Sequence, residues 1–252
     1  LKIRKGSRER AKGYGIDENF NEDIVDDSLD WIREKGKDIE KPWMLTVNTL
    51  APHFPHEISR KYWELYEGKG DLPQYNSECE TARHPYAEDL RSHFETQYFS
   101  EKDIRGMRRG YYGKVSYVDS VLGLLIDALE ESGQLEDTVI IYTSDHGEML
   151  GKFDMWWKCS LYEDSARIPL IIAGPGFNRG SRVRTPVNLF DLQASIFRIF
   201  DRNKPQSWWG SSLQDISDND ENRPVFSEYH GHGVRAAAYM VRKGDWKLLH
   251  NT

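Results

Sequence analysis

The chain has 252 residues, of which 38% are hydrophobic and 30% are charged, a composition typical of globular proteins. Its formal net charge of -7 argues against general nucleic-acid binding, and no apolar run approaches the roughly 20 residues that a membrane-spanning helix needs. We therefore expect a soluble protein with no nucleic-acid or membrane partner. The 2 cysteines make no disulfide framework and point weakly to a reducing compartment, while the sequence leaves a cytoplasmic and a periplasmic location both open.

The first part of the chain predicts helices and one strand ahead of a long polar segment. Residues 1–16 are basic but lack the apolar core of a signal peptide, so we expect a surface loop. Apolar residues spaced among acids predict an amphipathic helix over 17–36, and residues 61–66 predict a short aromatic helix or turn. The run PWMLTVNT at 42–49 predicts a strand. Residues 68–99 are polar and predict a long excursion that shapes access to a site.

A histidine follows the predicted strand over 42–49 within the sequence LAPHFPH. His53 therefore lies at the carboxyl end of that strand, where open α/β sheets bind ligands. The alternative is a turn histidine that Pro52 and Pro55 hold in place. We favour a functional role because a second strand in this chain also ends in polar residues.

The longest predicted helix covers residues 100–133, with Ser100 as its N-cap and Gly133 at its C-terminal end. It leads into a β-branched run at 139–142, and a second apolar run at 170–173 also predicts a buried strand. A helix followed by a buried strand is the repeating unit of a mostly parallel sheet. We therefore expect an α/β fold with a mostly parallel sheet flanked by helices.

The strand over 139–142 ends in the sequence TSDHG. Asp145 can supply a hard oxygen to a cation, and His146 can donate a hydrogen bond to an anion or act as an acid. Gly147 permits backbone geometry that is closed to other residues. If the sheet is parallel here, His53 and Asp145 lie at the same carboxyl edge.

The end of the chain predicts a helix over 188–200 and a small antiparallel sheet. Its strands are expected at 224–229, 236–242 and 245–250, the last two joined in a hairpin. We place a domain boundary after residue 205, so that 1–205 form part of the α/β domain and 206–252 begin a C-terminal subdomain.

Three residues at the end of the predicted strand over 224–229 are candidates for lining a substrate pocket. They are Glu228, Tyr229 and His230. Polar and aromatic residues in the loops that follow strands often carry binding functions.

The residues from Ser144 to Gly176 carry a resemblance to a known family. The order S-D-H-G-E-x-L-G, then W-x-K-C-S-x-Y-E-x-S-A-R-I-P-L-I-I-x-G-P-G, closely resembles the sulfatases of the alkaline-phosphatase superfamily. The D-H-G variant and the S-A-R-x-P ending are most similar to choline-sulfatases and phosphonate monoesterases. Within this stretch, Glu163 and Arg167 predict a structural ion pair.

This resemblance implies an alkaline-phosphatase-like fold and the hydrolysis of a small-molecule or carbohydrate sulfate ester. It implies that Asp145 binds a divalent cation, with Ca²⁺ favoured over Mg²⁺ or Mn²⁺. Lys158 would contact the anionic ester oxygens, although its position between aromatic residues also fits a surface lysine. His53 and His146 would contact the ester and help the leaving oxygen depart, with His146 as the preferred acid. The oligomeric state is left open, so an oligomer is compatible with the sequence.

The family's nucleophile motif, C-x-P-S-R, has no match in the expected place, and neither do its early acid pair and lysine–histidine pair. The C-E-T-A-R sequence at Cys79 lacks the proline and comes too late, so we interpret Cys79 as a loop thiol. We therefore expect the C-terminal part of a longer sulfatase-like enzyme that is inactive alone, with the formylglycine nucleophile in the missing N-terminal part. The alternatives are a phosphonate or phosphate ester hydrolase of the same superfamily and a non-catalytic remnant.

Overall fold

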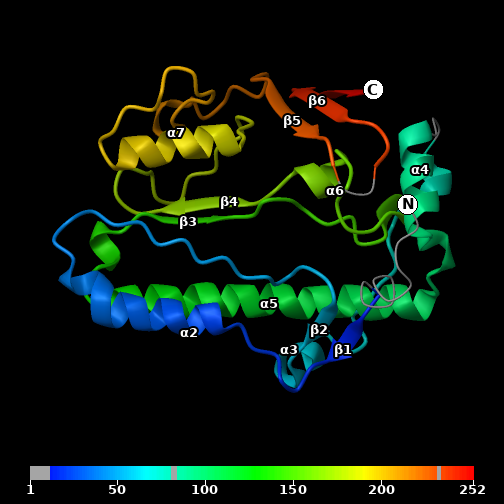
Figure 1. Cartoon of the computed structure of the whole chain (residues 1–252), viewed down its shortest axis with the longest axis horizontal. Helices are drawn as coiled ribbons and strands as arrows, with labels where there is room; N and C mark the ends of the chain where they lie inside the picture. Colours follow the sequence, from blue (N-terminus) through cyan, green and yellow to red (C-terminus); the bar gives the residue numbers. More distant parts are fainter. Residues whose placement is uncertain (1–11, 81–83, 232–233) are drawn as a thin grey trace. The chain divides into compact units, whose positions relative to one another are not determined.

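A computed structural model describes residues 12–80, 84–231 and 234–252 of the protein (Figure 1). The chain divides into two compact units, which we call the first and the second unit. The first comprises Leu1–Glu136 and Met149–Trp157, and the second comprises Asp137–Glu148 and Lys158–Thr252. The predicted boundary after residue 205 does not coincide with this division and stays a prediction.

The first unit is organised around the long helix α5, Glu101–Glu131, as predicted (Figure 1). A capping box fixes its start, because the Ser100 hydroxyl accepts from the Asp103 amide at 3.2 Å and Asp103 accepts from the Ser100 amide at 3.1 Å. Gly133 follows the helix with a φ of 73°, which suits a residue without a side chain. The helix packs against α2, α3, β1 and β2.

The first unit contains one short parallel pair of strands. Strand β1, Tyr14–Ile16, pairs in parallel with β2, His56–Ile58. The sequence did not predict β1, which lies at the end of the expected surface loop; residues 1–11 of that loop lie outside the described residues. The strand predicted over 42–49 is wrong. From residue 43 its residues alternate between half-buried and exposed, as in a strand, but no described strand pairs with them.

The other helices of the first unit agree in part with the sequence. Helix α2 covers Asp23–Asp30, later than the predicted start at 17, and continues as a π-helix, Trp31–Lys35. Helix α3, Arg60–Glu64, is confirmed. Helix α4, Pro85–Phe94, lies in the segment predicted to be a polar excursion. The short 3₁₀ turns described in the first unit are Gly36–Asp38, Ser77–Cys79, Thr96–Tyr98, Leu135–Asp137 and Lys152–Asp154. The turn Leu135–Asp137 extends by one residue into the second unit.

The second unit contains both strands predicted around the site. Strand β3, Ile140–Thr143, pairs with β4, Leu170–Ala173, and the pairing is antiparallel. This differs from the parallel order expected from the sequence. Parallel neighbours usually need a crossover that contains a full helix, whereas the connection between β3 and β4 contains the 3₁₀ turn Lys152–Asp154 and the four-residue helix α6, Glu163–Ala166.

The rest of the second unit follows the sequence-based expectation closely. Helix α7, Leu189–Ile199, starts after Asn188, whose side chain accepts from the Phe190 amide at 3.0 Å. A 3₁₀ turn covers Leu213–Asp215. Three antiparallel strands close the chain in the order β5–β6–β7. Their bounds are Val225–Tyr229, Ala238–Lys243 and Trp246–Asn251.

The α/β class and the small C-terminal antiparallel sheet are thus confirmed, while parallel pairing among the described strands is limited to β1 with β2. Within the part of the chain that the structure describes, no helix is long and apolar enough to cross a membrane.

Candidate active site

The turn after β3 carries an acid and an imidazole side by side. The Asp145 side chain is 83% exposed, and its Oδ1 accepts from the His146 amide at 2.9 Å. The His146 Nδ1 bonds to the Gly147 carbonyl at 2.8 Å, and because a carbonyl only accepts, Nδ1 carries the proton. The other ring nitrogen, Nε2, lies 3.6 Å from Asp145 Oδ2. The strand end therefore presents a carboxylate and an oriented imidazole, as the sequence predicted.

Gly147 is required here by close packing. Its amide donates to the Ser165 carbonyl at 2.7 Å. A Cβ at position 147 would lie 2.0 Å from the carbonyl oxygen of Asp164, which is main chain and cannot move aside easily. Gly147 does not have a positive φ, so it does not adopt the special backbone geometry expected from the sequence. A glycine is needed here because a side chain would clash with the main chain of Asp164.

Ser165 connects this turn to the segment that carries Lys158. The Ser165 side chain is buried, and its hydroxyl donates to the Lys158 carbonyl at 3.2 Å. The same hydroxyl lies 3.0 Å from the Ser160 hydroxyl. One residue of α6 thus contacts the turn through its carbonyl and the Lys158 segment through its side chain. Sequence reasoning gave Ser165 no role; the available signal was a small hydroxyl residue within S-A-R-I-P.

The segment around Lys158 is held on its other side by a tyrosine. Lys158 is half-buried, and the next residue, Cys159, is 3% exposed. The Tyr229 hydroxyl donates to the Cys159 Sγ at 3.3 Å. Burial raises the pKa of the Cys159 thiol, and the Tyr229 bond and the Lys158 charge oppose that rise only in part. Cys159 therefore serves as a buried contact beside Lys158.

The predicted ion pair between Glu163 and Arg167 is wrong. Glu163 pairs with Lys247 at 2.5 Å, and Lys247 also donates to the Leu161 carbonyl at 2.8 Å. A lysine of β7 therefore holds the start of α6. Sequence spacing could not reveal this partner, because it lies far along the chain.

The three candidates at the end of β5 do not share one face. Alternation along a strand points Glu228 and Tyr229 to opposite faces of the sheet. Tyr229 contacts Cys159, whereas Glu228 Oε2 lies 2.8 Å from the Nε2 of His230. The His230 ring packs edge-on against Tyr239 with centroids 5.0 Å apart. The structure therefore brings Tyr229 toward Lys158 and pairs the other two residues with each other.

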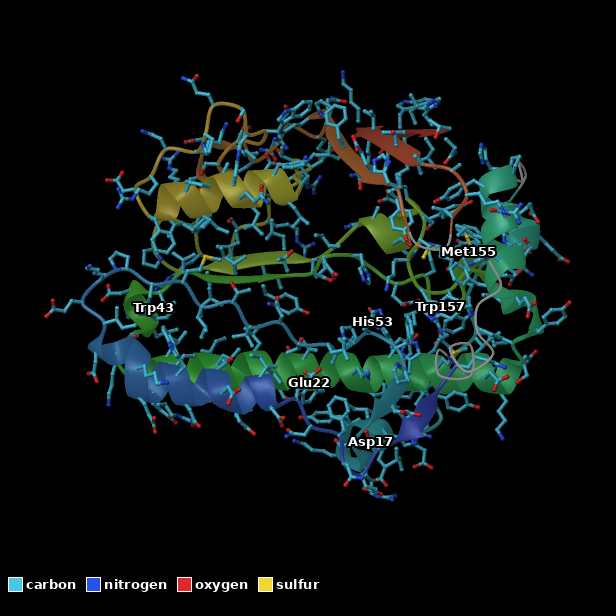
Figure 2. All side chains as sticks on the ribbon, in the orientation of Figure 1. Asp17, Glu22, Trp43, His53, Met155 and Trp157 are labelled. Atoms are coloured by element: carbon cyan, nitrogen blue, oxygen red, sulfur yellow. The ribbon has the colours of Figure 1, made fainter. Side chains whose placement is uncertain are left out.

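His53 belongs to the first unit and is fixed by its own segment and by α5 (Figure 2). Its Nδ1 donates to the Phe54 carbonyl at 2.8 Å, and its amide donates to the Leu50 carbonyl at 2.9 Å. Lys114 donates to the His53 carbonyl at 2.9 Å. Because no described strand leads directly into His53, the argument from sheet edges does not apply to it, and its proximity to Asp145 stays a prediction.

A strained loop of the first unit precedes Lys158. Leu150, Phe153, Asp154 and Trp157 all have positive φ angles, which non-glycine residues rarely adopt. Long-range hydrogen bonds hold the loop in this shape. They run from Arg108 to the Leu150 carbonyl (2.8 Å), from Arg91 to the Phe153 carbonyl (2.9 Å) and from Thr96 to the Asp154 carbonyl (2.5 Å). Two residues of the predicted polar excursion, Arg91 and Thr96, and Arg108 of α5 therefore brace this loop.

Trp157 ends the strained loop in an aromatic cluster of the first unit (Figure 2). Its ring centroid lies 4.9 Å from that of Phe94, 5.7 Å from that of Phe54 and 6.4 Å from that of Phe99. Phe54 follows His53 directly and packs against its ring at 4.2 Å. The cluster therefore joins the strained loop to the His53 segment.

The described residues do not by themselves form a metal centre. A cation bound through oxygen takes about six ligands, whereas the described part of the chain contains no group of three or more His, Cys, Asp or Glu side chains able to hold one. Asp145 fits as a single hard ligand because its carboxylate is exposed. The structure therefore supports one ligand and no complete coordination sphere.

Comparisons with known proteins agree on one family. The model of the Sulfatase family matches residues 4–201. The choline-sulfatase of Rhizobium meliloti (strain 1021) is 31% identical, over 94% of this chain and 49% of the relative. The arylsulfatase K of Bos taurus is 29% identical, over 89% of this chain and 46% of the relative. The chain thus spans about half the length of the curated relatives it matches.

Solved structures agree with this assignment. The phosphonate monoester hydrolase SpPMH from Silicibacter pomeroyi superimposes with a TM-score of 0.73 at 26% identity, over 91% of this chain and 52% of that chain. BT4656, solved with its substrate D-glucosamine-2-N,6-O-disulfate, has a TM-score of 0.76 at 20% identity, over 90% of this chain and 59% of that chain, and supports the fold. Because the family model covers most of its length, the chain belongs to the sulfatase family and has that family's alkaline-phosphatase-like α/β fold.

Proposed function

We propose that the complete protein is a hydrolase that cleaves sulfuric esters. The observation that carries the proposal is the framework around Ser165, which connects the turn of Asp145 and His146 to the segment of Lys158. An acid can bind a cation, an imidazole can transfer a proton, and an ammonium group can attract an anionic ester. The names of the curated relatives, choline-sulfatase and arylsulfatase K, support the same activity.

Each residue of this framework has a distinct role in the proposal. The Lys158 ammonium acts as a compact positive charge for the non-bridging oxygens of the ester. The doubly protonated ring of His146 transfers the proton on Nε2 to the leaving oxygen, while the proton on Nδ1 stays bonded to the Gly147 carbonyl. His53 keeps the role that the resemblance implies, which is contact with the ester.

The candidates at the end of β5 are proposed to bind the substrate. Tyr229 has the best support, because it contacts the neighbour of Lys158. Glu228 and His230 form an exposed hydrogen-bonded pair and would act together on the rest of the substrate. Substituting Tyr229 and the pair separately would test the two groups independently.

The proposal also includes a divalent cation and a nucleophile. Asp145 would supply one carboxylate ligand, with Ca²⁺ favoured over Mg²⁺ or Mn²⁺, and a bound cation of this kind neutralises negative charge on the ester. The formylglycine nucleophile expected for the family has no matching motif in this chain. The role of Asp145 can be tested by cation binding to wild-type protein and to Asp145→Asn.

The substrate is proposed to be a small-molecule or carbohydrate sulfate ester. Choline sulfate is the first compound to test, because the choline-sulfatase relative matches 94% of this chain. The likeness to the hydrolase from Silicibacter pomeroyi favours one alternative, which is cleavage of a phosphonate monoester.

The deciding experiment gives the complete, cation-loaded protein choline sulfate, 4-nitrophenyl sulfate and a phenyl phosphonate monoester. Release of sulfate, lost in both His146→Ala and Lys158→Ala, is the expected result. Turnover of the phosphonate alone would replace the proposal with the alternative. A folded protein that cleaves none of the three substrates would instead be a non-catalytic member of the family.

A further inference from the structure

Two charged side chains hold the backbone of the segment that leads to His53. Lys114 of α5 is 4% exposed, and its Nζ donates to the His53 carbonyl at 2.9 Å. Glu22, the N-cap residue of α2, accepts through Oε1 from the Leu50 amide at 2.8 Å and from the Ala51 amide at 2.9 Å. Hydrogen bonds to charged groups are stronger than neutral ones. Figure 2 shows Glu22 and His53 beside α5.

Lys114 occupies a buried position of α5 at which packing alone would favour an apolar residue. The buried residues of α5, all of which the structure describes, form a helical stripe that includes Met107, Val118 and Val121. Lys114 is the charged member of that stripe. A methionine would fill the same space without burying a charge, so the ammonium has a use other than filling the core.

The surroundings of Lys114 show what its burial costs and what offsets it. Burial lowers the pKa of Lys114 from 10.5 to about 8, while the carboxylates of Glu22, Glu57 and Asp17 act in the opposite direction. Its ammonium also lies 5.5 Å from the centre of the Phe20 ring. Three acids therefore favour the charged lysine, but its hydrogen bond goes to the His53 carbonyl.

That carbonyl helps to set the direction of the imidazole. The Nδ1 of His53 donates to the carbonyl of the next residue, Phe54, so the ring direction depends on the backbone between them. Lys114 fixes the carbonyl at one end of this backbone, and Glu22 fixes two amides shortly before it. Hydrogen bonds of this kind can orient a functional side chain indirectly, by fixing the groups to which that side chain is bonded.

We propose that Lys114 and Glu22 are positioning residues that fix the orientation of His53 for ester cleavage. The inference rests on the proposed function, in which His53 contacts the ester. Neither residue needs to touch the substrate, because both act through the backbone of residues 50–53.

The kinetic test uses the complete protein with 4-nitrophenyl sulfate. Lys114→Met and Glu22→Ala should lower kcat by roughly 10- to 100-fold, with a smaller change in KM, because a misplaced group loses rate. Glu22→Gln keeps an acceptor oxygen and should retain most of the activity. Lys102→Met is the matched control, because Lys102 is an exposed lysine of the same helix, and it should behave as wild type.

A second readout separates positioning from a loss of folding. Nitrogen-15 spectra of labelled histidines should show the protonated Nδ1 of His53, assigned by its absence in His53→Ala. This signal should change in Lys114→Met and Glu22→Ala and stay constant in Glu22→Gln and Lys102→Met, with circular dichroism unchanged. If Lys114→Met does not fold, the comparison of Glu22→Ala with Glu22→Gln still decides the question.

The outcomes distinguish the inference from the function on which it rests. If His53→Ala loses turnover while Lys114→Met and Glu22→Ala keep it, the inference is overturned and the function stands. Wild-type turnover in His53→Ala would remove His53 from the reaction and overturn its proposed role. An unchanged His53 signal in folded Lys114→Met and Glu22→Ala would overturn the inference whatever the rates are.

Discussion

The amide of Gly147 donates to the carbonyl of Ser165 at 2.7 Å, and the α-carbon of Gly147 faces the carbonyl of the residue before Ser165. The turn that carries Asp145 and His146 therefore lies against main chain. Main chain cannot rotate away as a side chain can, so any added atom at position 147 must displace the turn itself.

Gly147→Ala should for this reason destabilise the protein and abolish turnover. Its Cβ would meet the Asp164 oxygen at 2.0 Å, and overpacking of this kind typically costs about 1–3 kcal/mol. Gly123→Ala is the matched control, because nothing lies within 4 Å of its added Cβ, and alanine in a helix is better by roughly 0.5–1 kcal/mol. Urea unfolding of both variants checks the prediction, and equal stability of the two would contradict it.

Lys158→Ala should lower turnover by about 2–4 kcal/mol of activation free energy, the range for a lost group that stabilises an oxyanion. Lys158→Arg should restore little, because a planar guanidinium does not replace a compact ammonium.

Lys152→Ala serves as the control for Lys158. The Lys152 Nζ lies 5.9 Å from the centre of the Tyr75 ring and 5.6 Å from that of Phe153, beside two aromatic rings of the first unit. Turnover at saturating substrate should stay within about threefold of wild type, as expected for a residue outside the chemistry. The same large loss in both variants would show that the loop is disturbed in general and that Lys158 has no specific role.

Acid should destabilise the protein through His56. This residue is fully buried, and its ring nitrogens have no hydrogen-bond partner among the described residues. Burial, aided by the charge of Lys114, lowers the pKa of His56 from 6.5 to about 3. Between these values the unfolded chain binds the proton and the folded chain does not, so stability falls as the pH drops through this window.

The full effect, reached below the folded-state pKa, is roughly 5 kcal/mol, because each unit of pKa difference corresponds to about 1.4 kcal/mol. His56→Leu should flatten the pH dependence and leave the neutral-pH stability nearly unchanged, because it removes no hydrogen bond among the described groups. Melting temperatures measured from about pH 7 to pH 4 would test this. Parallel curves for wild type and variant would rule out His56 as the source.

Thr96→Val should loosen the strained loop before Lys158. The Thr96 hydroxyl donates to the Asp154 carbonyl at 2.5 Å, and Asp154 has a φ of 58°. Losing the donor leaves a carbonyl without that bond and should cost about 1–2 kcal/mol. Faster proteolysis within residues 149–157 is the expected readout. Thr46→Val, at an exposed position, is the control and should be cleaved at the wild-type rate.

Sequence reasoning worked where the deciding contacts are local. Helix α5 was predictable because Ser100 and Asp103 cap each other within one turn and the apolar stripe is continuous. The strands on both sides of the Asp145 turn were predictable from β-branched runs. The direction of their pairing was not, because it depends on the path of the chain between them.

The failures share a cause, which is dependence on distant partners. Strand β1 is three residues long and is defined by β2, which lies about 40 residues later. Residues 43–49 have the alternation of a strand, but the structure gives them no described neighbour. No sequence motif marks the supporting role of Lys114, Glu22 or Ser165. That role can be seen only once the structure shows their hydrogen-bond partners.

The two cysteines differ in burial, and this difference makes them a natural chemical probe of the Lys158 segment. Cys79 is exposed, whereas Cys159 lies beneath Tyr229 next to Lys158. A thiol reagent should therefore modify one site at once and the other only when the Lys158 segment opens. The slow phase measures the opening of the segment in solution without any engineered label. If a substrate or an anion bound at Lys158 slows that phase, then binding at Lys158 and opening of its segment are coupled. The native Cys159 thiol would report this coupling directly.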